Sequence, residues 1–212
     1  FPGFYFPMSI LWNKNIFERE GLPNLYELYD NKEWTYDKFK EIALEATRDT
    51  DGDGETDQWG LGMENFCGKS LYWFYTNNAP IIQNQDGKWV FKGDQSEALT
   101  PMNMLKGLAE KGALHPGRIH SVKKPWQNGK VAMLVAPKAA GRNEMEEDFG
   151  VVPLPMGPNA EDYKPVCDPM KAAIHVPITE DKPKALVELI TALYKIAEPY
   201  IDKEEYMEGY WQ

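Results

Sequence analysis

The segment NGKVAMLVAP, residues 128–137, decides the fold class. Its apolar run from Val131 to Val135 has the length of a strand, and Gly129 and Pro137 bound it. A short, continuously apolar run of this kind is typical of a buried strand. Further strands are predicted at residues 9–12, 60–64, 151–154 and 172–176.

Helical segments alternate with these strands. Apolar side chains recur at helical spacing over residues 36–47, and Thr35 is placed to cap the first turn. Further helices are predicted at residues 71–75, from Pro101 to Gly112, and after Asp181, with Pro183 in the first turn. The alternation predicts a single α/β lobe over residues 1–212 rather than a sandwich or a helical bundle.

Two turns are also predicted. Asp86-Gly87 stands between Ile81-Ile82 and residues 89–91, which is a β-hairpin signal. Residues 13–15 lead out of the first strand, and we expect a turn there.

The composition excludes several classes of protein. The chain has 212 residues, 42% of them hydrophobic, and a formal net charge of −10, which would repel nucleic acid. No apolar run approaches the roughly 18 residues needed to span a bilayer. The chain begins at Phe1 without a Met, so we expect it to be a piece of a longer protein.

The segment DTDGDGETD, residues 49–57, has the spacing of a calcium-binding loop. Positions 1, 3, 5 and 9 of that loop are occupied by Asp49, Asp51, Asp53 and Asp57. Gly54 stands at position 6, where the chain must turn, and the backbone carbonyl of Glu55 at position 7 would be a further ligand. So many carboxylates repel one another unless a cation neutralises them.

The same loop departs from the pattern at position 12. Gly60 stands there instead of a bidentate Glu, so one ligand must come from elsewhere in the fold or from water. The spacing predicts one structural Ca²⁺ site; the alternative is a solvated acidic turn.

No sequence motif for catalysis is present. The three histidines form no H-E-x-x-H pair, and there is no G-x-S-x-G elbow, phosphate-binding loop or dinucleotide fingerprint. The 7 Trp and 11 Tyr instead favour a polar ligand with apolar faces, such as a sugar. LYWFYTNN, residues 71–78, is the densest aromatic segment; each ring taken singly is better explained as part of the core, whereas the set favours a ligand.

Several segments, taken in order, resemble the extracellular solute-binding proteins of ABC importers, in the maltose-binding-like class that mostly carries sugars. The resemblance covers residues 5–197 and rests on ILWNKNIFEREGLP (10–23), EWTYDKFKEIALEAT (33–47), DTDGDGETDQWGLGM (49–63), KPWQNGKVAMLVAP (124–137), FGVVPLPMGP (149–158) and AAIHVPITEDKPKALVELITAL (172–193). Trp126 replaces the Phe that is usual in the fourth segment.

The resemblance implies a periplasmic-binding-protein type II-like lobe, with a mixed sheet flanked by helices. Family members have two lobes that close on a ligand, and this chain resembles the second lobe alone. The implied function is capture of a solute of the mono- or oligosaccharide class and its delivery to an ABC permease, without enzymatic chemistry. The implied location is extracellular, as a membrane-anchored lipoprotein or a periplasmic protein.

The resemblance also implies where ligand contacts lie. One place follows the strand after the calcium-type loop, another follows the strand at 131–135, and the third precedes the strand at 172–176. The matching residues here are Asn65, Phe66, Lys69, Tyr72, Trp73, Lys138, Arg142, Asp168 and Lys171. In the second place sugar binders commonly have a Trp, whereas this chain has Ala139, Ala140 and Gly141.

This departure leaves two interpretations open. Either the missing lobe supplies the stacking ring, or the ligand is acidic and the cationic side chains neutralise it. The same cations could also be solvated surface groups. Cys67 and Cys167 could pair or remain small buried thiols. The alternative function is a polysaccharide-acting enzyme or its carbohydrate-binding accessory domain.

Overall fold

The computed structural model describes residues 7–63, 69–117, 122–137, 145, 147–167 and 181–197. The chain divides into two compact units, one formed by residues 5–168 and the other by residues 1–4 with 169–212. In the larger unit the elements are β1 (Pro7–Asn13), α1 (Lys14–Glu20), α2 (Leu25–Asp30), α3 (Tyr36–Glu45), β2 (Trp59–Met63), α5 (Leu71–Thr76), β3 (Ile82–Gln85), β4 (Lys88–Phe91), α6 (Ser96–Glu110), α7 (Lys123–Gln127), β5 (Val131–Pro137), β6 (Phe149–Pro153) and β7 (Val166–Cys167).

The main sheet of the larger unit is mixed. Its strands run in the order β2-β5-β1-β6, and β7 pairs with β1 as well. β1 is antiparallel to β5, β6 and β7, whereas β2 is parallel to β5. The mixed α/β architecture predicted from the sequence is therefore confirmed.

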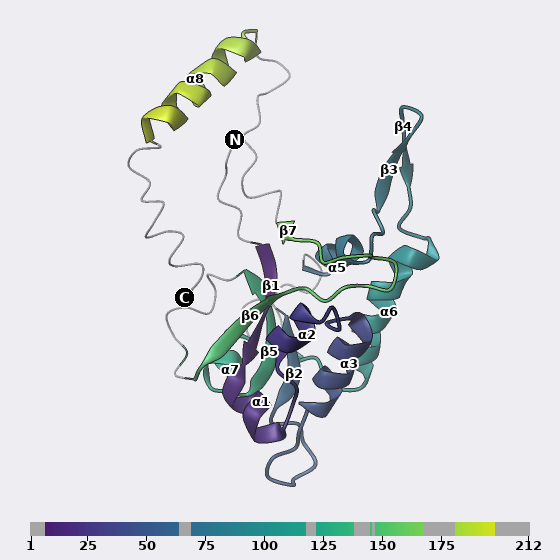
Figure 1. Ribbon diagram of the computed structural model, residues 1–212, viewed down its shortest axis with the longest axis vertical. Helices are drawn as coiled ribbons and strands as arrows, with labels where there is room; N and C mark the ends of the chain where they lie inside the picture. Colours follow the sequence, from purple (N-terminus) through teal and green to yellow (C-terminus); the bar gives the residue numbers. More distant parts are fainter. Residues whose placement is uncertain are drawn as a thin grey trace. The chain divides into compact units, whose positions relative to one another are not determined.

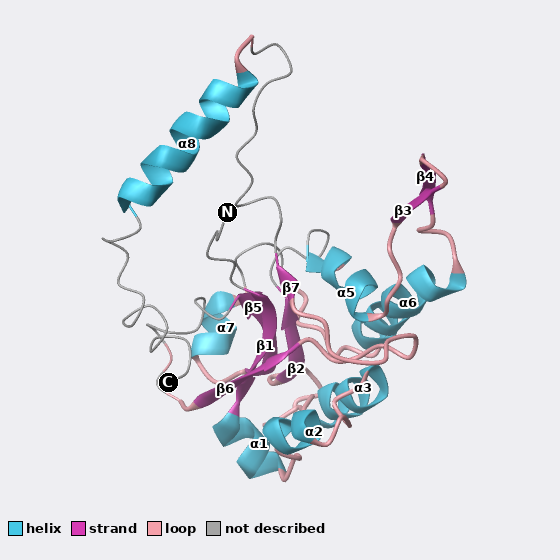
Figure 2. Cartoon of the chain, turned by 45° about the horizontal axis from the view of Figure 1, so that its top comes forward, coloured by secondary structure: helices cyan, strands magenta, loops and turns pink. Residues whose placement is uncertain are grey.

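The central strands are buried on both faces, because side chains of a strand point alternately to opposite sides. On β1, Ile10 and Trp12 belong to a core that includes residues of α1, α2, α3, α5 and α6. Leu11, between them, packs in a second core with Trp126 of α7. Helices accordingly lie on both sides of the sheet (Figures 1 and 2).

The helix predicted at residues 36–47 is α3. The Thr35 side chain accepts a hydrogen bond from the amide of Lys38 and so caps its first turn. α3 lies directly against β2: a Cβ added to Gly60 would be 1.7 Å from the carbonyl oxygen of Ala43. Only glycine permits this approach of helix to strand.

The helix predicted from Pro101 instead starts at Ser96 and becomes α6. Pro101 therefore lies inside the helix, where it has no amide to donate to the carbonyl of Glu97. The side-chain amide of Asn77 donates to that carbonyl at 2.6 Å. Asn77, which follows the last residue of α5, thus satisfies the acceptor that the proline leaves free.

Residues 13–15 form no turn, contrary to expectation. The Asn13 side chain accepts from the amide of Ile16 and caps α1, so strand passes directly into helix. The short helices α1 and α2 were not predicted. The strand predicted at 172–176 lies outside the described residues.

The predicted hairpin is formed by β3 and β4. Asp86 and Gly87 both have positive φ, 52° and 83°, as a type I′ turn requires. The hairpin projects away from α5 and α6 (Figure 1).

In the smaller unit the described element is α8 (Pro183–Ala197). It begins at the proline that the sequence placed in its first turn, where a missing amide costs no hydrogen bond. Among the described helices, none has the length and apolar character needed to cross a membrane.

Candidate functional site

Three strands of the main sheet end at the same edge. β2 and β5 run in parallel and pair Met63 with Val135, so their carboxyl ends lie together. Met8 of β1 pairs with both Pro137 of β5 and Val166 of β7, which brings the end of β7 to that edge. In open α/β sheets, ligands commonly bind beyond the carboxyl ends of strands.

The predicted ligand-contact segments continue from these ends. One follows β2 and leads into α5, the second follows β5, and the third follows β7. Several predicted residues lie outside the described part of the chain: Asn65, Phe66, Lys138, Arg142, Asp168 and Lys171. The described strands therefore show that the three segments start from one edge of the sheet.

Lys69 contacts one of these strand ends. Its Nζ donates a hydrogen bond of 3.2 Å to the carbonyl oxygen of Val135, which belongs to the last residue pair between β5 and β2. A cationic side chain thus reaches across from the start of α5 to the carboxyl end of β5.

The two aromatic residues predicted on α5 have different environments. Trp73 is fully buried, and its ring centroid is 5.1 Å from that of Phe39 and 5.7 Å from that of Tyr36. Tyr72 is partly buried and packs against the same core. The burial gives Trp73 a packing role in the lobe, and Tyr72 keeps part of its surface in solvent.

The same helix exposes an aromatic ring that sequence reasoning did not select. Tyr75 is 51% exposed, and Leu71, one turn earlier on the same face, is also exposed. The helical periodicity of LYWFYT could have separated these residues from Trp73 and Phe74, because the two pairs fall on opposite faces.

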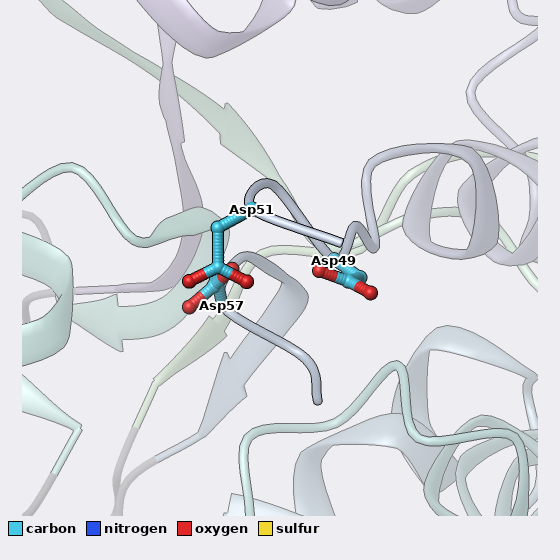
Figure 3. Close-up of side chains that lie close together, drawn as sticks. All are labelled: Asp49, Asp51 and Asp57. Carbon is cyan, nitrogen blue, oxygen red and sulfur yellow. The ribbon is translucent and has the colours of Figure 1, made fainter. Parts of the chain in front are cut away.

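The acidic loop brings three carboxylates together. Oxygen atoms of Asp49, Asp51 and Asp57 all lie within 4.8 Å of one another (Figure 3). Two oxygens on opposite sides of a Ca²⁺ ion, each at about 2.4 Å, would be separated by about 4.8 Å. The cluster can therefore hold one divalent cation.

Hydrogen bonds within the loop keep two of these carboxyl groups ionised. The amides of Gly54 and Gly52 donate to Asp49 at 2.8 and 2.7 Å, and these bonds lower the pKa of its carboxyl group. The amide and hydroxyl of Thr50 donate to Asp57 and lower its pKa in the same way. An ionised carboxylate is the form that binds a cation.

The predicted ligand Asp53 lies outside this cluster of three carboxylates. The Asp53 carboxylate accepts a 2.8 Å hydrogen bond from the amide of Glu55. The loop is closed by a bridge between Arg48 and Gln58, in which the amide of Arg48 donates to the carbonyl of Gln58 at 2.8 Å. α3 and β2 thus hold both ends of the loop.

A pocket of about 380 Å³ opens elsewhere, between α3 and α6. Its lining includes Tyr36, Lys40, Asn103 and Lys111. Among the described residues predicted to contact a ligand, none lines this pocket.

Comparison with known proteins gives similarity at the level of structure. The sequence matches no family model and no curated protein. The structure is similar to the maltose/maltodextrin-binding domain MalE of Bdellovibrio bacteriovorus bound to maltotriose, with 18% identity and a TM-score of 0.54, covering 75% of this chain and 39% of that one.

Two further solved structures are similar. The ABC substrate-binding protein Lmo0181 of Listeria monocytogenes, in complex with cycloalternan, has 15% identity and a TM-score of 0.55, covering 87% of this chain and 45% of that one. UgpB of Mycobacterium tuberculosis, in complex with glycerophosphocholine, has 23% identity and a TM-score of 0.53, covering 73% and 38%.

The chain therefore spans less than half the length of these structures. The sequence identities are 15% to 23%, so the similarity establishes the fold alone. The resemblance predicted from the sequence is confirmed at this level: the chain has the α/β fold found in part of ABC solute-binding proteins.

Proposed function

We propose that this chain is the second lobe of an ABC solute-binding protein that captures a carbohydrate and delivers it to a membrane permease. The observation that carries the proposal is the fold, which this chain shares with a protein bound to maltotriose and another bound to cycloalternan. Binding without chemistry agrees with these two neighbours, which are described as a maltose/maltodextrin-binding domain and a substrate-binding protein.

The ligand would bind beyond the carboxyl ends of β2, β5 and β7. Asn65, Phe66, Lys69 and Tyr72 belong to the first segment there, and Trp73, predicted with them, packs in the core beside Phe39. The other two segments carry Lys138, Arg142, Asp168 and Lys171. The first lobe of the same protein would supply the remaining contacts.

The first experiment is a thermal-shift screen of the full-length protein against neutral and acidic mono- and oligosaccharides, with glycerophosphocholine included because UgpB binds it. A ligand bound at 100 times its Kd stabilises the folded state by about 2.7 kcal/mol. We expect a rise in Tm specific to one class of saccharide. A flat response to every saccharide would contradict the proposal.

Lys69 tests whether the ligand is acidic. With the acidic saccharide that gives the largest shift, Lys69→Met should weaken binding about tenfold, and Lys69→Arg should restore it because the charge returns. Lys106→Met, on the exposed surface of α6, is the matched control. Equal binding by Lys69→Met and the wild type would show that this cation plays no part.

Residues 1–212 expressed alone should bind the same saccharide weakly, since half of the proposed contacts would be missing. Isothermal titration against the full-length protein measures the difference. Nanomolar affinity of the isolated chain would contradict a two-lobe site.

We further propose that the protein acts outside the cytoplasmic membrane, as a periplasmic protein or a membrane-anchored lipoprotein. An imported sugar has to be bound outside the membrane before a permease can carry it across. Fractionation of the source cells, followed by detection with an antibody, tests the location. Recovery of the protein in the cytosol alone would contradict it.

The acidic loop is proposed to bind a structural Ca²⁺ ion. Asp49, Asp51 and Asp57 would supply carboxylate oxygens to the ion. The Asp53 carboxylate and the backbone carbonyl of Glu55 would be its further ligands from the loop. Hard oxygen ligands in a flexible loop suit Ca²⁺ better than the smaller Mg²⁺, which demands octahedral geometry. The ion would hold the connection between α3 and β2 in one conformation.

Thermal unfolding in millimolar calcium and in EDTA tests this site. We expect a higher Tm with calcium, and loss of the difference in Asp51→Asn, which keeps the shape of the side chain but removes its charge. Asp30→Asn, on α2, is the control. Because hydrogen bonds in the folded loop lower the pKa of Asp49 and Asp57, the calcium effect should persist below pH 3.8, the ordinary Asp pKa, and be lost only as the pH falls through the lowered pKa of these groups. An unchanged Tm in calcium would exclude the site.

A further inference from the structure

The hairpin presents an apolar face to solvent. β3 and β4 pair Ile82 with Phe91 and Asn84 with Trp89, and residues directly opposite in an antiparallel pair share one face. These four residues form what we call the hairpin face. Trp89 is 74% exposed, Phe91 63% and Ile82 57%. Large apolar side chains exposed side by side commonly mark a binding surface.

The hairpin holds this face in a defined conformation. The type I′ turn is braced by Asn84, whose side chain accepts a 2.9 Å hydrogen bond from the amide of Gly87. At the other end the amide of Lys92 donates to the carbonyl of Ile81 at 2.7 Å and extends the ladder. The Phe91 ring lies against Gly93, where an added Cβ would be 2.5 Å from its Cζ.

The dimensions of the face limit what can bind there. Each strand has four residues, so the face measures about 13 by 10 Å, on the order of 130 Å². A stable protein interface needs about 800 Å² per partner. One or two sugar rings fit this area, whereas a second protein would need a much larger one.

The chemistry of the face points to an uncharged ligand. It combines two aromatic rings, one aliphatic side chain and one amide, and none of its four side chains is charged. Aromatic faces stack on apolar ring faces, and an amide both donates to and accepts from hydroxyl groups. The opposite face carries Gln83, Gln85, Lys88 and Val90, with no exposed aromatic ring.

We propose that the hairpin face is a surface site for a neutral polysaccharide, separate from the ligand site at the carboxyl edge of the main sheet. Trp89 is the stacking platform, Phe91 and Ile82 extend it, and Asn84 binds hydroxyl groups. The site stands on the geometry of the hairpin and does not require the proposed transport function.

Native gel electrophoresis of the full-length protein tests this site, with gels containing soluble starch, mixed-linkage β-glucan, galactomannan or arabinoxylan. Retardation in at least one neutral polymer is expected. Trp89→Ala should lower the affinity for that polymer, measured from the retardation, about tenfold, which corresponds to about 1.4 kcal/mol. Val90→Ala, on the opposite face, should leave it unchanged. Both variants should keep the thermal shift with small saccharides.

Three results would overturn the inference. The first is the absence of retardation in every neutral polymer, and the second is equal retardation of Trp89→Ala and the wild type. The third is a wild-type dimer in sedimentation that Trp89→Ala converts to monomer, which would assign the face to self-association. Failure of the small-saccharide screen would bear on the proposed transport function alone.

Discussion

The main sheet and the β3–β4 hairpin are both built from short strands, but their side chains have opposite environments. Ile10 and Leu11 of β1 point to different faces of the sheet and are both fully buried. In the hairpin, Trp89 and Phe91 are mostly exposed. The sheet therefore depends on packing against helices, whereas the hairpin depends on its turn and its own ladder.

This difference separates stability from recognition. Substitutions in the sheet should change the free energy of unfolding, because they disturb close-packed atoms. Substitutions on the hairpin face should change binding and leave stability nearly unaltered. Paired variants, one in each region, test whether stability and binding separate in this way.

The largest effect is expected from alanine at Gly60. Its Cβ would lie 1.7 Å from a backbone oxygen of α3, so the helix would have to move away from β2. We expect a destabilisation above about 4 kcal/mol, or no folded protein. Gly87→Ala in the hairpin turn, where no atom lies within 4 Å, should cost only the strain of its positive φ, about 1–2 kcal/mol.

Urea unfolding followed by far-UV circular dichroism measures both variants. Similar midpoints for Gly60→Ala and Gly87→Ala would show that α3 and β2 can separate without penalty.

A smaller effect is expected from removing one core ring. Phe39 is fully buried between Trp34 and Trp73, with ring centroids 5.8 and 5.1 Å away. Phe39→Ala should cost about 3–5 kcal/mol. Trp89→Ala removes a larger ring but should cost less than about 0.5 kcal/mol, because that ring is already in solvent.

Calorimetric unfolding of the two variants measures their losses of stability and so tests this prediction. A loss of stability in Trp89→Ala comparable with that in Phe39→Ala would mean that the hairpin ring is packed in solution.

The smallest effect concerns pH. His115 is tied to β2 by its amide, which donates to Leu61 at 2.8 Å, and its ring packs on Trp59 at 4.6 Å. Burial lowers the pKa of His115 below 6.5. The unfolded chain therefore takes up this proton at higher pH, and the free energy of unfolding should fall as pH drops from 6.5 through the folded pKa.

NMR titration of the His115 ring checks the direction of its pKa shift. His115→Gln should flatten the pH dependence of unfolding in this range. The hairpin, residues 82–91, contains no histidine, so Gly87→Ala should leave the same dependence unchanged. A pKa at or above 6.5 would contradict the packing of His115.

Much of the fold could be predicted because its signals are local. The apolar run at residues 131–135, the capping Thr35 and the Asp86-Gly87 turn each specify backbone conformation through neighbouring residues alone. The spacing of Asp49, Asp51 and Asp57 likewise places their carboxylates on one loop, where short-range hydrogen bonds arrange them.

Other features depend on contacts between distant residues. α6 begins before Pro101 because Asn77, on a separate segment, satisfies the carbonyl of Glu97. Asn13 caps a helix where a turn was expected: its side-chain oxygen accepts from the amide of Ile16, and its side-chain amide donates to the carboxylate of Glu147, far along the chain. Neither partner can be identified from local propensity.

The sequence alone thus specified the α/β class, the acidic loop and the hairpin, since each is encoded within a few consecutive residues. Packing alone assigned Trp73 to the core and Trp89 to solvent, although both lie in similar aromatic segments. It also brought the carboxyl ends of β2, β5 and β7 to one edge, because strand order is set by pairing between residues far apart in the chain.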